Sequence, residues 1–172
     1  MTATANAEFL NEAIAAFWDF LNADQRYRDL GLKEFRLTDG KILPIDKQGG
    51  ISIRDLPAVY VRNVTTNPLE RRRTPYIDEW EIVLSMGVVA GAESSHEFHN
   101  SLWITSAVMT IVDVIGNRAA KSSRLNAPTI ISAYDYEVGE LAPVVREDTR
   151  RVIYWDAEMT IRLTRTRNLP AA

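Results

Sequence analysis

The last part of the chain, from Arg151 to Thr164, alternates apolar and polar residues almost without a break. Successive side chains of a β-strand point to opposite faces, so this pattern predicts a strand with one buried and one polar face. At roughly 3.3 Å per residue the strand would span about 45 Å, well beyond the usual strand of about five or six residues. Such a strand is more typical of a scaffold or an assembly surface than of an active site. Its apolar positions are Ile153, Trp155, Ala157, Met159, Ile161 and Leu163.

Composition narrows the class of protein. A chain of 172 residues suits one domain with a sizeable core. The formal net charge of −3 argues against general attraction to nucleic acid or to an anionic membrane. The absence of cysteine excludes disulfides, thiolate metal sites and cysteine nucleophiles. We find neither a secretory signal nor a membrane-spanning tract, so we expect a soluble protein made in the cytoplasm.

Apolar residues at helical spacing predict two helices, at Asn6–Leu21 and Ser94–Gly116. Ser94 and Glu97 have the spacing of a capping box at the start of the second helix. This helix is apolar over most of its circumference. We therefore expect it to contact the sheet and also the first helix or a neighbouring subunit.

Further strands are predicted at Leu56–Val64, Glu79–Val89 and Thr129–Val138. The first two flank a long loop, Thr65–Asp78, and suggest an extended antiparallel hairpin. A smaller hairpin is predicted from Glu34–Leu37 and Lys41–Ile45 around the turn at Asp39 and Gly40.

The order of helix, strands, helix and strands predicts a single α+β domain over residues 1–172. We expect both helices on one face of an antiparallel sheet, with a flexible loop at 65–78 and frayed termini. Four large side chains should form one apolar layer between sheet and helix, namely Trp80, Phe98, Leu102 and Trp155.

The search for chemistry gives no catalytic, cofactor-binding or metal-binding residue. His96 and His99 could approach one metal ion, but an ordinary exposed helix start explains them better, because no third ligand is evident. Acidic residues cluster at Asp78/Glu79/Glu81, Asp135/Glu137/Glu140 and Asp156/Glu158, and members two positions apart on a strand share a face. These faces look solvated, so paired acid and base roles are not expected. The sequence predicts a protein that is not an enzyme.

Three consecutive arginines, Arg71, Arg72 and Arg73, lie in the long loop together with Tyr76. A solvated loop is one interpretation. The other is docking to an acidic or phosphate-bearing surface, where arginine forks make bidentate contacts. Nucleic-acid binding would be better supported by aromatic residues interleaved with the basic ones, and only Tyr76 is near. We therefore take these four residues as candidate partner-binding residues for protein docking.

This arrangement resembles the tail terminator, or tail completion, proteins of long-tailed bacteriophages. The matching features are the helix Ala7–Leu21, two strands around Thr65–Asp78, the helix Ser94–Gly116, and the last strands Thr129–Val138 and Arg151–Thr164. The likeness is one of element order and not of a residue motif. The segment Asp39–Gly50 has no counterpart in the family pattern.

The resemblance implies a structural virion protein that forms a ring, typically a hexamer, on the head-proximal end of the tail tube. Such a ring stops tube polymerisation and joins the tail to the neck and head. Implied partners are further copies of the chain, the tail tube protein and neck or head-completion proteins, with the tail sheath as a further candidate. DNA would only pass through the lumen, and no membrane or cofactor is involved. The protein would be assembled in the host cytoplasm and reside in the phage tail or neck.

Two alternatives stay open. Another head–tail connector or neck protein would share the same fold logic. A small-molecule-binding α+β domain or an enzyme with a curved sheet would instead need a pocket with converging polar groups.

Overall fold

The computed structural model describes residues 3–36, 56–69, 77–93, 97–116, 129–140, 144–145 and 151–168. Its helices and strands form an α+β fold, as the sequence predicts. The elements follow in the order α1 (Ala3–Asn22), α2 (Gln25–Asp29), β1 (Lys33–Phe35), β2 (Ala58–Pro68), β3 (Ile77–Glu93), α3 (Glu97–Gly116), β4 (Thr129–Glu140), β5 (Val144–Val145) and β6 (Arg151–Asn168).

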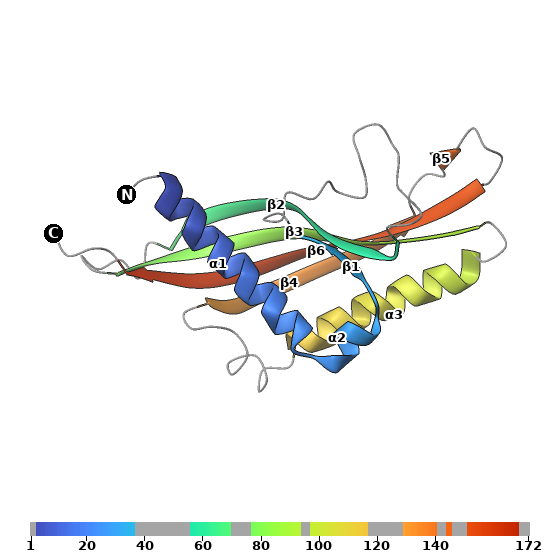
Figure 1. The fold of residues 1–172 in the computed structure, drawn as a ribbon, viewed down its shortest axis with the longest axis horizontal. Helices are drawn as coiled ribbons and strands as arrows, with labels where there is room; N and C mark the ends of the chain where they lie inside the picture. Colours follow the sequence, from blue (N-terminus) through green and yellow to red (C-terminus); the bar gives the residue numbers. More distant parts are fainter. Residues whose placement is uncertain are drawn as a thin grey trace.

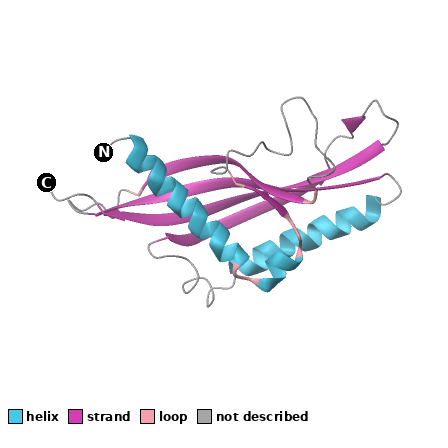
Figure 2. Ribbon diagram, viewed as in Figure 1, coloured by secondary structure: helices cyan, strands magenta, loops and turns pink. Residues whose placement is uncertain are grey.

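The strands make one sheet in the order β1-β2-β3-β6-β4, and β5 pairs with one end of β6. The centre of the sheet is the antiparallel pair β3–β6, which runs from Ile77 opposite Asn168 to Glu93 opposite Val152. Figure 1 shows α1 crossing the strands obliquely, whereas α3 lies beside the half of the sheet that is farther from the N-terminus. The strands lie together as one layer in Figure 2.

The alternation that predicted the last strand is confirmed where its side chains are described. Ala157, Met159, Ile161 and Leu163 are buried, whereas Glu158 and Arg162 between them are exposed. On β3, Ile82, Leu84, Met86 and Val88 are buried on the corresponding face, and Gly87, Val89 and Ala90 are buried as well, so burial no longer alternates at that end of the strand. The first four lie opposite Leu163, Ile161, Met159 and Ala157 of β6, so the two strands present a continuous apolar face.

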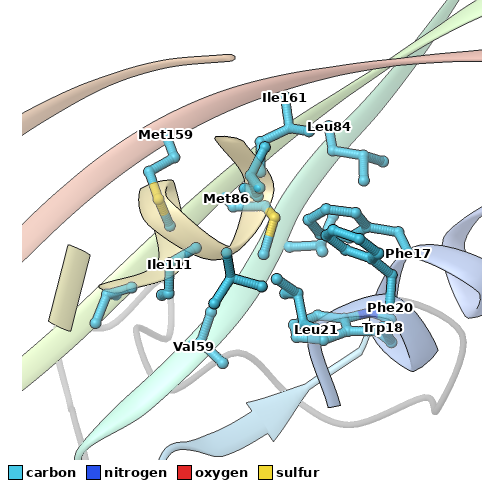
Figure 3. Close-up of a cluster of buried hydrophobic side chains, with 14 of the residues drawn as sticks. Phe17, Trp18, Phe20, Leu21, Val59, Leu84, Met86, Ile111, Met159 and Ile161 are labelled. Atoms are coloured by element: carbon cyan, nitrogen blue, oxygen red, sulfur yellow. The ribbon is translucent and has the colours of Figure 1, made fainter. Parts of the chain in front are cut away.

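Both helices bury their apolar residues on that face, which we call the inner face. Helix α1 supplies four large side chains, and Figure 3 shows them facing residues of β2, β3, β6 and α3. They are Phe17, Trp18, Phe20 and Leu21, all with no exposed surface. Helix α3 adds Ile104, Val108 and Ile111 to the same cluster. The opposite face of the sheet, called the outer face here, carries Glu81, Ser85, Glu158 and Arg162.

The hairpin of β2 and β3 is antiparallel as expected, but its loop is shorter than predicted. Strand β2 continues through Thr65 to Pro68, and β3 begins at Ile77. The polar residues Thr65 to Asn67 looked like loop, yet they pair with Val83 to Glu81 of β3. The backbone hydrogen bonds of this pairing favour the strand although the side chains are polar. A bulge near Arg62 shifts the alternation of side chains by one residue, so Val64 and Thr66 lie on the inner face with Val59 and Val61.

The small hairpin predicted at Glu34–Ile45 is only partly described. Residues 33–35 do form a strand, but β1 pairs in parallel with Ala58 to Tyr60 of β2. The expected all-antiparallel sheet is therefore wrong at this edge. The predicted partner strand, Lys41–Ile45, lies outside the described residues.

The predicted apolar layer needs a second correction. Leu102 points away from the sheet and is 54 % exposed, because the buried side of α3 is formed by Ile104, Val108 and Ile111. Trp80 is half-buried on the inner face. The side chains of Phe98 and Trp155 lie outside the described residues.

One contact on the outer face depends on the absence of a side chain. Tyr60 of β2 is buried and lies directly over Gly87 of β3. A Cβ atom at Gly87 would stand only 2.3 Å from Cζ of Tyr60. Arg62 covers this ring, with its guanidinium 5.8 Å from the ring centre and an N–H donated to the Tyr60 hydroxyl at 3.1 Å.

We expect Gly87→Ala to destabilise the fold by about 1–3 kcal/mol, because the added methyl must displace a packed ring. Chemical unfolding measures the change. Ser85→Ala, on the same face of the same strand, should stay within about 0.5 kcal/mol of the wild type. In the double variant Tyr60→Ala/Gly87→Ala the costs should be less than additive. Strictly additive costs would mean that the two residues do not touch.

Candidate interaction surfaces

The predicted partner-binding residues Arg71, Arg72, Arg73 and Tyr76 lie outside the described residues, as does His96. His99 lies in α3, and its side chain is likewise outside the description.

Within the described ranges, no three His, Cys, Asp or Glu side chains gather as a metal site would require. No helix in this part of the chain is long and apolar enough to span a membrane.

The acidic residues on the strands are bonded to arginines of neighbouring elements. Asp78 is buried and accepts two hydrogen bonds from Arg167, opposite it on β6. Glu81 accepts from Arg162 at 3.4 Å, and Glu158 accepts from Arg62. These carboxylates hold strands together, and their partners could not be found from sequence because strand order determines them.

A second acidic centre lies where α2 meets β1. The Glu34 carboxylate accepts from the Tyr27 hydroxyl at 2.9 Å and from the Asn22 amide at 2.7 Å. Its other oxygen accepts from the Arg36 guanidinium at 2.9 and 2.7 Å. A cavity of about 350 Å³ lies beside it, lined by Asn22, Tyr27, Arg28, Gly31, Leu32, Lys33 and Glu34. Because both oxygens of the Glu34 carboxylate accept hydrogen bonds, this side chain links β1 to α1 and α2.

Burial of Tyr27 and the negative charge of Glu34 both raise the pKa of the Tyr27 phenol far above its usual value. Desolvation is the larger cause, because a phenolate would lose its hydration in this site. Tyr27 is only 3 % exposed. The neutral phenol is therefore favoured in the folded state.

The outward side of α3 carries two of the exposed large apolar side chains in the part of the chain that the structure describes. Leu102 and Met109 are each 54 % exposed and lie seven positions apart, two helical turns along one side. Thr105 and Ser106 are exposed between them, and Asp113 follows one turn later. We call these five residues the α3 outward stripe. Of the two second contacts expected for this helix, the one with the first helix is present, since α3 packs against α1 and also against α2.

The first turns of α1 are fastened to the end of β6 by two arginines. Arg167 donates to the Asn6 side chain at 2.9 Å, and Arg165 bonds to Glu12. The Phe9 ring lies within 5.3 Å of the Arg165 guanidinium and 5.7 Å of that of Arg167. The hydrogen bonds to Asp78 raise the pKa of the Arg167 guanidinium, so it stays charged. A cavity opens beside this contact.

We expect the stabilising effect of Tyr27 to disappear at high pH. Its folded-state pKa lies above the ordinary value of 10.0, so its contribution is complete below pH 10 and is lost as the unfolded phenol ionises above it. Tyr27→Phe should cost about 1.5–3 kcal/mol at pH 8, through the lost hydrogen bond to a charged group. Urea unfolding should show this difference narrowing by about 1.4 kcal/mol per pH unit above pH 10. A constant difference up to pH 11.5 would contradict the assignment.

In comparisons with known proteins, no family model and no curated sequence matches this chain.

Proposed function

We propose that the protein is a structural component of a phage virion, of the tail terminator type, and that it acts as a ring without catalysing a reaction. In this role, copies of the chain close into a hexamer on the head-proximal end of the tail tube. The ring stops tube growth and offers a surface to neck or head-completion proteins. The sheath of a contractile tail is a further candidate partner.

The observation that carries the proposal is the arrangement of the elements. An N-terminal helix, a long antiparallel hairpin, a central helix and a final strand pair occur in the order that the resemblance implies. The final strand β6 lies between β3 and β4, so the hairpin and the last pair form one sheet. Both helices cover one face of it. This supports a terminator-like domain, and the role in the virion is our inference.

The α3 outward stripe supports self-association. A ring needs a head-to-tail interface between two different surfaces of neighbouring copies. Leu102 and Met109 would lose their contact with water in such an interface, while the small Thr105 and Ser106 between them permit close approach. We assign the stripe to the contact with a second copy.

Leu102→Ser/Met109→Ser should leave the fold intact and lower the mass of the assembly to that of a monomer. Both side chains are largely outside the core, so melting should change little, whereas the interface would lose its apolar centre. Light scattering after gel filtration measures the mass, and electron microscopy checks for rings. Ala15→Ser, at an exposed position of α1, is the matched control. Rings of normal size in the double variant would contradict the assignment of the α3 outward stripe to the contact between copies.

A second candidate function is favoured by the cavity of about 350 Å³ beside Glu34, which is large enough for a small metabolite. Its lining is mainly polar, and the Glu34 carboxylate is already engaged by three side chains. A monomer that binds a small molecule at this cavity would support the second candidate over the ring.

The predicted docking residues in the loop at 71–73 allow a test of how the ring attaches to tail or neck proteins. Changing Arg71, Arg72 and Arg73 to glutamate should preserve melting and ring formation but abolish joining of tails to heads or tubes. Each contact would be modest and would be multiplied around the ring. A complementation assay with electron microscopy measures joined tails. The triple lysine variant keeps the positive charge but lacks the guanidinium fork. It therefore separates the contribution of charge from that of bidentate hydrogen bonding. Normal joined tails with glutamate would leave the loop as a solvated connection only.

A further inference from the structure

A cavity of about 220 Å³ opens between the first turns of α1 and the end of the sheet. We call it the α1 socket. Four elements supply its wall, since residues from the helix face residues of three different strands. Its lining residues are Asn6, Phe9 and Leu10 of α1, Thr66 of β2, Trp80 of β3 and Arg167 of β6.

The wall of the α1 socket is held in place by bonds behind it. Arg167 donates to the buried Asp78 through Nε at 2.9 Å and to the Asn6 side chain at 2.9 Å. Its guanidinium also lies 5.2 Å from the Trp80 ring and 5.7 Å from the Phe9 ring. The guanidinium between the two rings is therefore held before any occupant arrives, which lowers the entropic cost of binding.

The size and the chemistry of the socket limit its occupant. Its volume of about 220 Å³ is below the range of about 300–1,000 Å³ that holds drug-sized ligands and cofactors. One leucine or phenylalanine side chain fits such a space. An anion is not favoured, because the positive charge of Arg167 is already paired with Asp78 at the back of the wall. The remaining lining, Phe9, Leu10 and Trp80, favours an apolar group.

Trp80 adds a directional requirement. Its indole Nε1 is shielded from solvent and has no acceptor within the described part of the structure. A buried donor without an acceptor is destabilising, so an occupant that brings a carbonyl close to the indole gains binding free energy. Because Nε1 is shielded while the socket is empty, the contact with a carbonyl requires the partly buried Trp80 ring to turn as the occupant enters. A peptide segment brings such a carbonyl next to each side chain.

We propose that the α1 socket receives one apolar side chain of a partner protein, with a backbone carbonyl next to that side chain accepting from Trp80. Tryptophan and arginine walls around a small pocket are typical of the places where a partner inserts an anchor residue. The proposal does not require the ring or the phage role, because the binding event concerns this socket alone.

The experiment follows Trp80 directly. The protein is labelled with 5-fluorotryptophan, and Trp80→Phe assigns its fluorine resonance. N-acetyl-leucine-methylamide should shift this resonance saturably in the millimolar range, as expected for a fragment of about a dozen atoms. N-acetyl-glycine-methylamide, which lacks the side chain, should not. 3-Methyl-1-butanol, which carries the side-chain group without a peptide carbonyl, should bind at least several-fold more weakly.

A matched pair of variants tests the location. Thr66→Phe places a ring in the socket, whereas Thr65→Phe places it on the outer face of the same strand. The shift should vanish in the first variant and persist in the second. The proposal is overturned if the leucine and glycine probes act alike, if the alcohol binds as well as the leucine amide, or if both variants keep the shift. It is also overturned if Thr66→Phe alone changes the assembly mass, since the occupant would then be a second copy.

Discussion

The antiparallel pairing of β3 with β6 is the contact on which the rest of the structure depends. The two strands are far apart in sequence, so their pairing closes a long stretch of chain, which is costly in entropy. β2 pairs with the other side of β3, and β4 with the other side of β6. The inner face exists only once both central strands are in register, and α1 and α3 bury their apolar residues on that face. If β6 shifted by one residue against β3, Met159 would turn toward the outer face while Met86 stayed on the inner one.

Sequence periodicity predicted the elements that are long and have one buried face. The strand at Arg151–Thr164 and the helix at Asn6–Leu21 belong to this class, because their patterns are set by burial on one side. Sequence periodicity gave wrong predictions where the pairing between strands decides the backbone conformation. Thr65 to Asn67 look like loop but are strand, since β3 supplies hydrogen-bond partners. The parallel pairing of β1 is accompanied by the Glu34 cluster, which brings together residues that no local pattern links.

The interaction surfaces were less predictable than the fold, for a related reason. The apolar run in α3 gave no indication that Leu102 would be the residue left outside, because a helix apolar on nearly all sides has no unique inward direction. The α1 socket joins Phe9, Thr66 and Arg167, which no spacing rule connects. The arginine triplet at 71–73 carries a local signal in the sequence, and its role in binding stays a prediction. Residues brought together by strand order carry no such signal.

The charges of the outer face bear on the proposed ring. Arg62 is paired with Glu158, and Arg162 with Glu81, all at least partly exposed. Such exposed pairs contribute only about 0–1 kcal/mol each, so stability alone does not explain them. Among the described residues of this face, each of these two arginines lies beside a carboxylate that offsets its charge. If this face lines the lumen of a ring, it would offer DNA phosphates little net attraction, and tight binding through counterion release would not develop. A passage for DNA requires this property, because a strongly basic wall would retain the strand that must move through it.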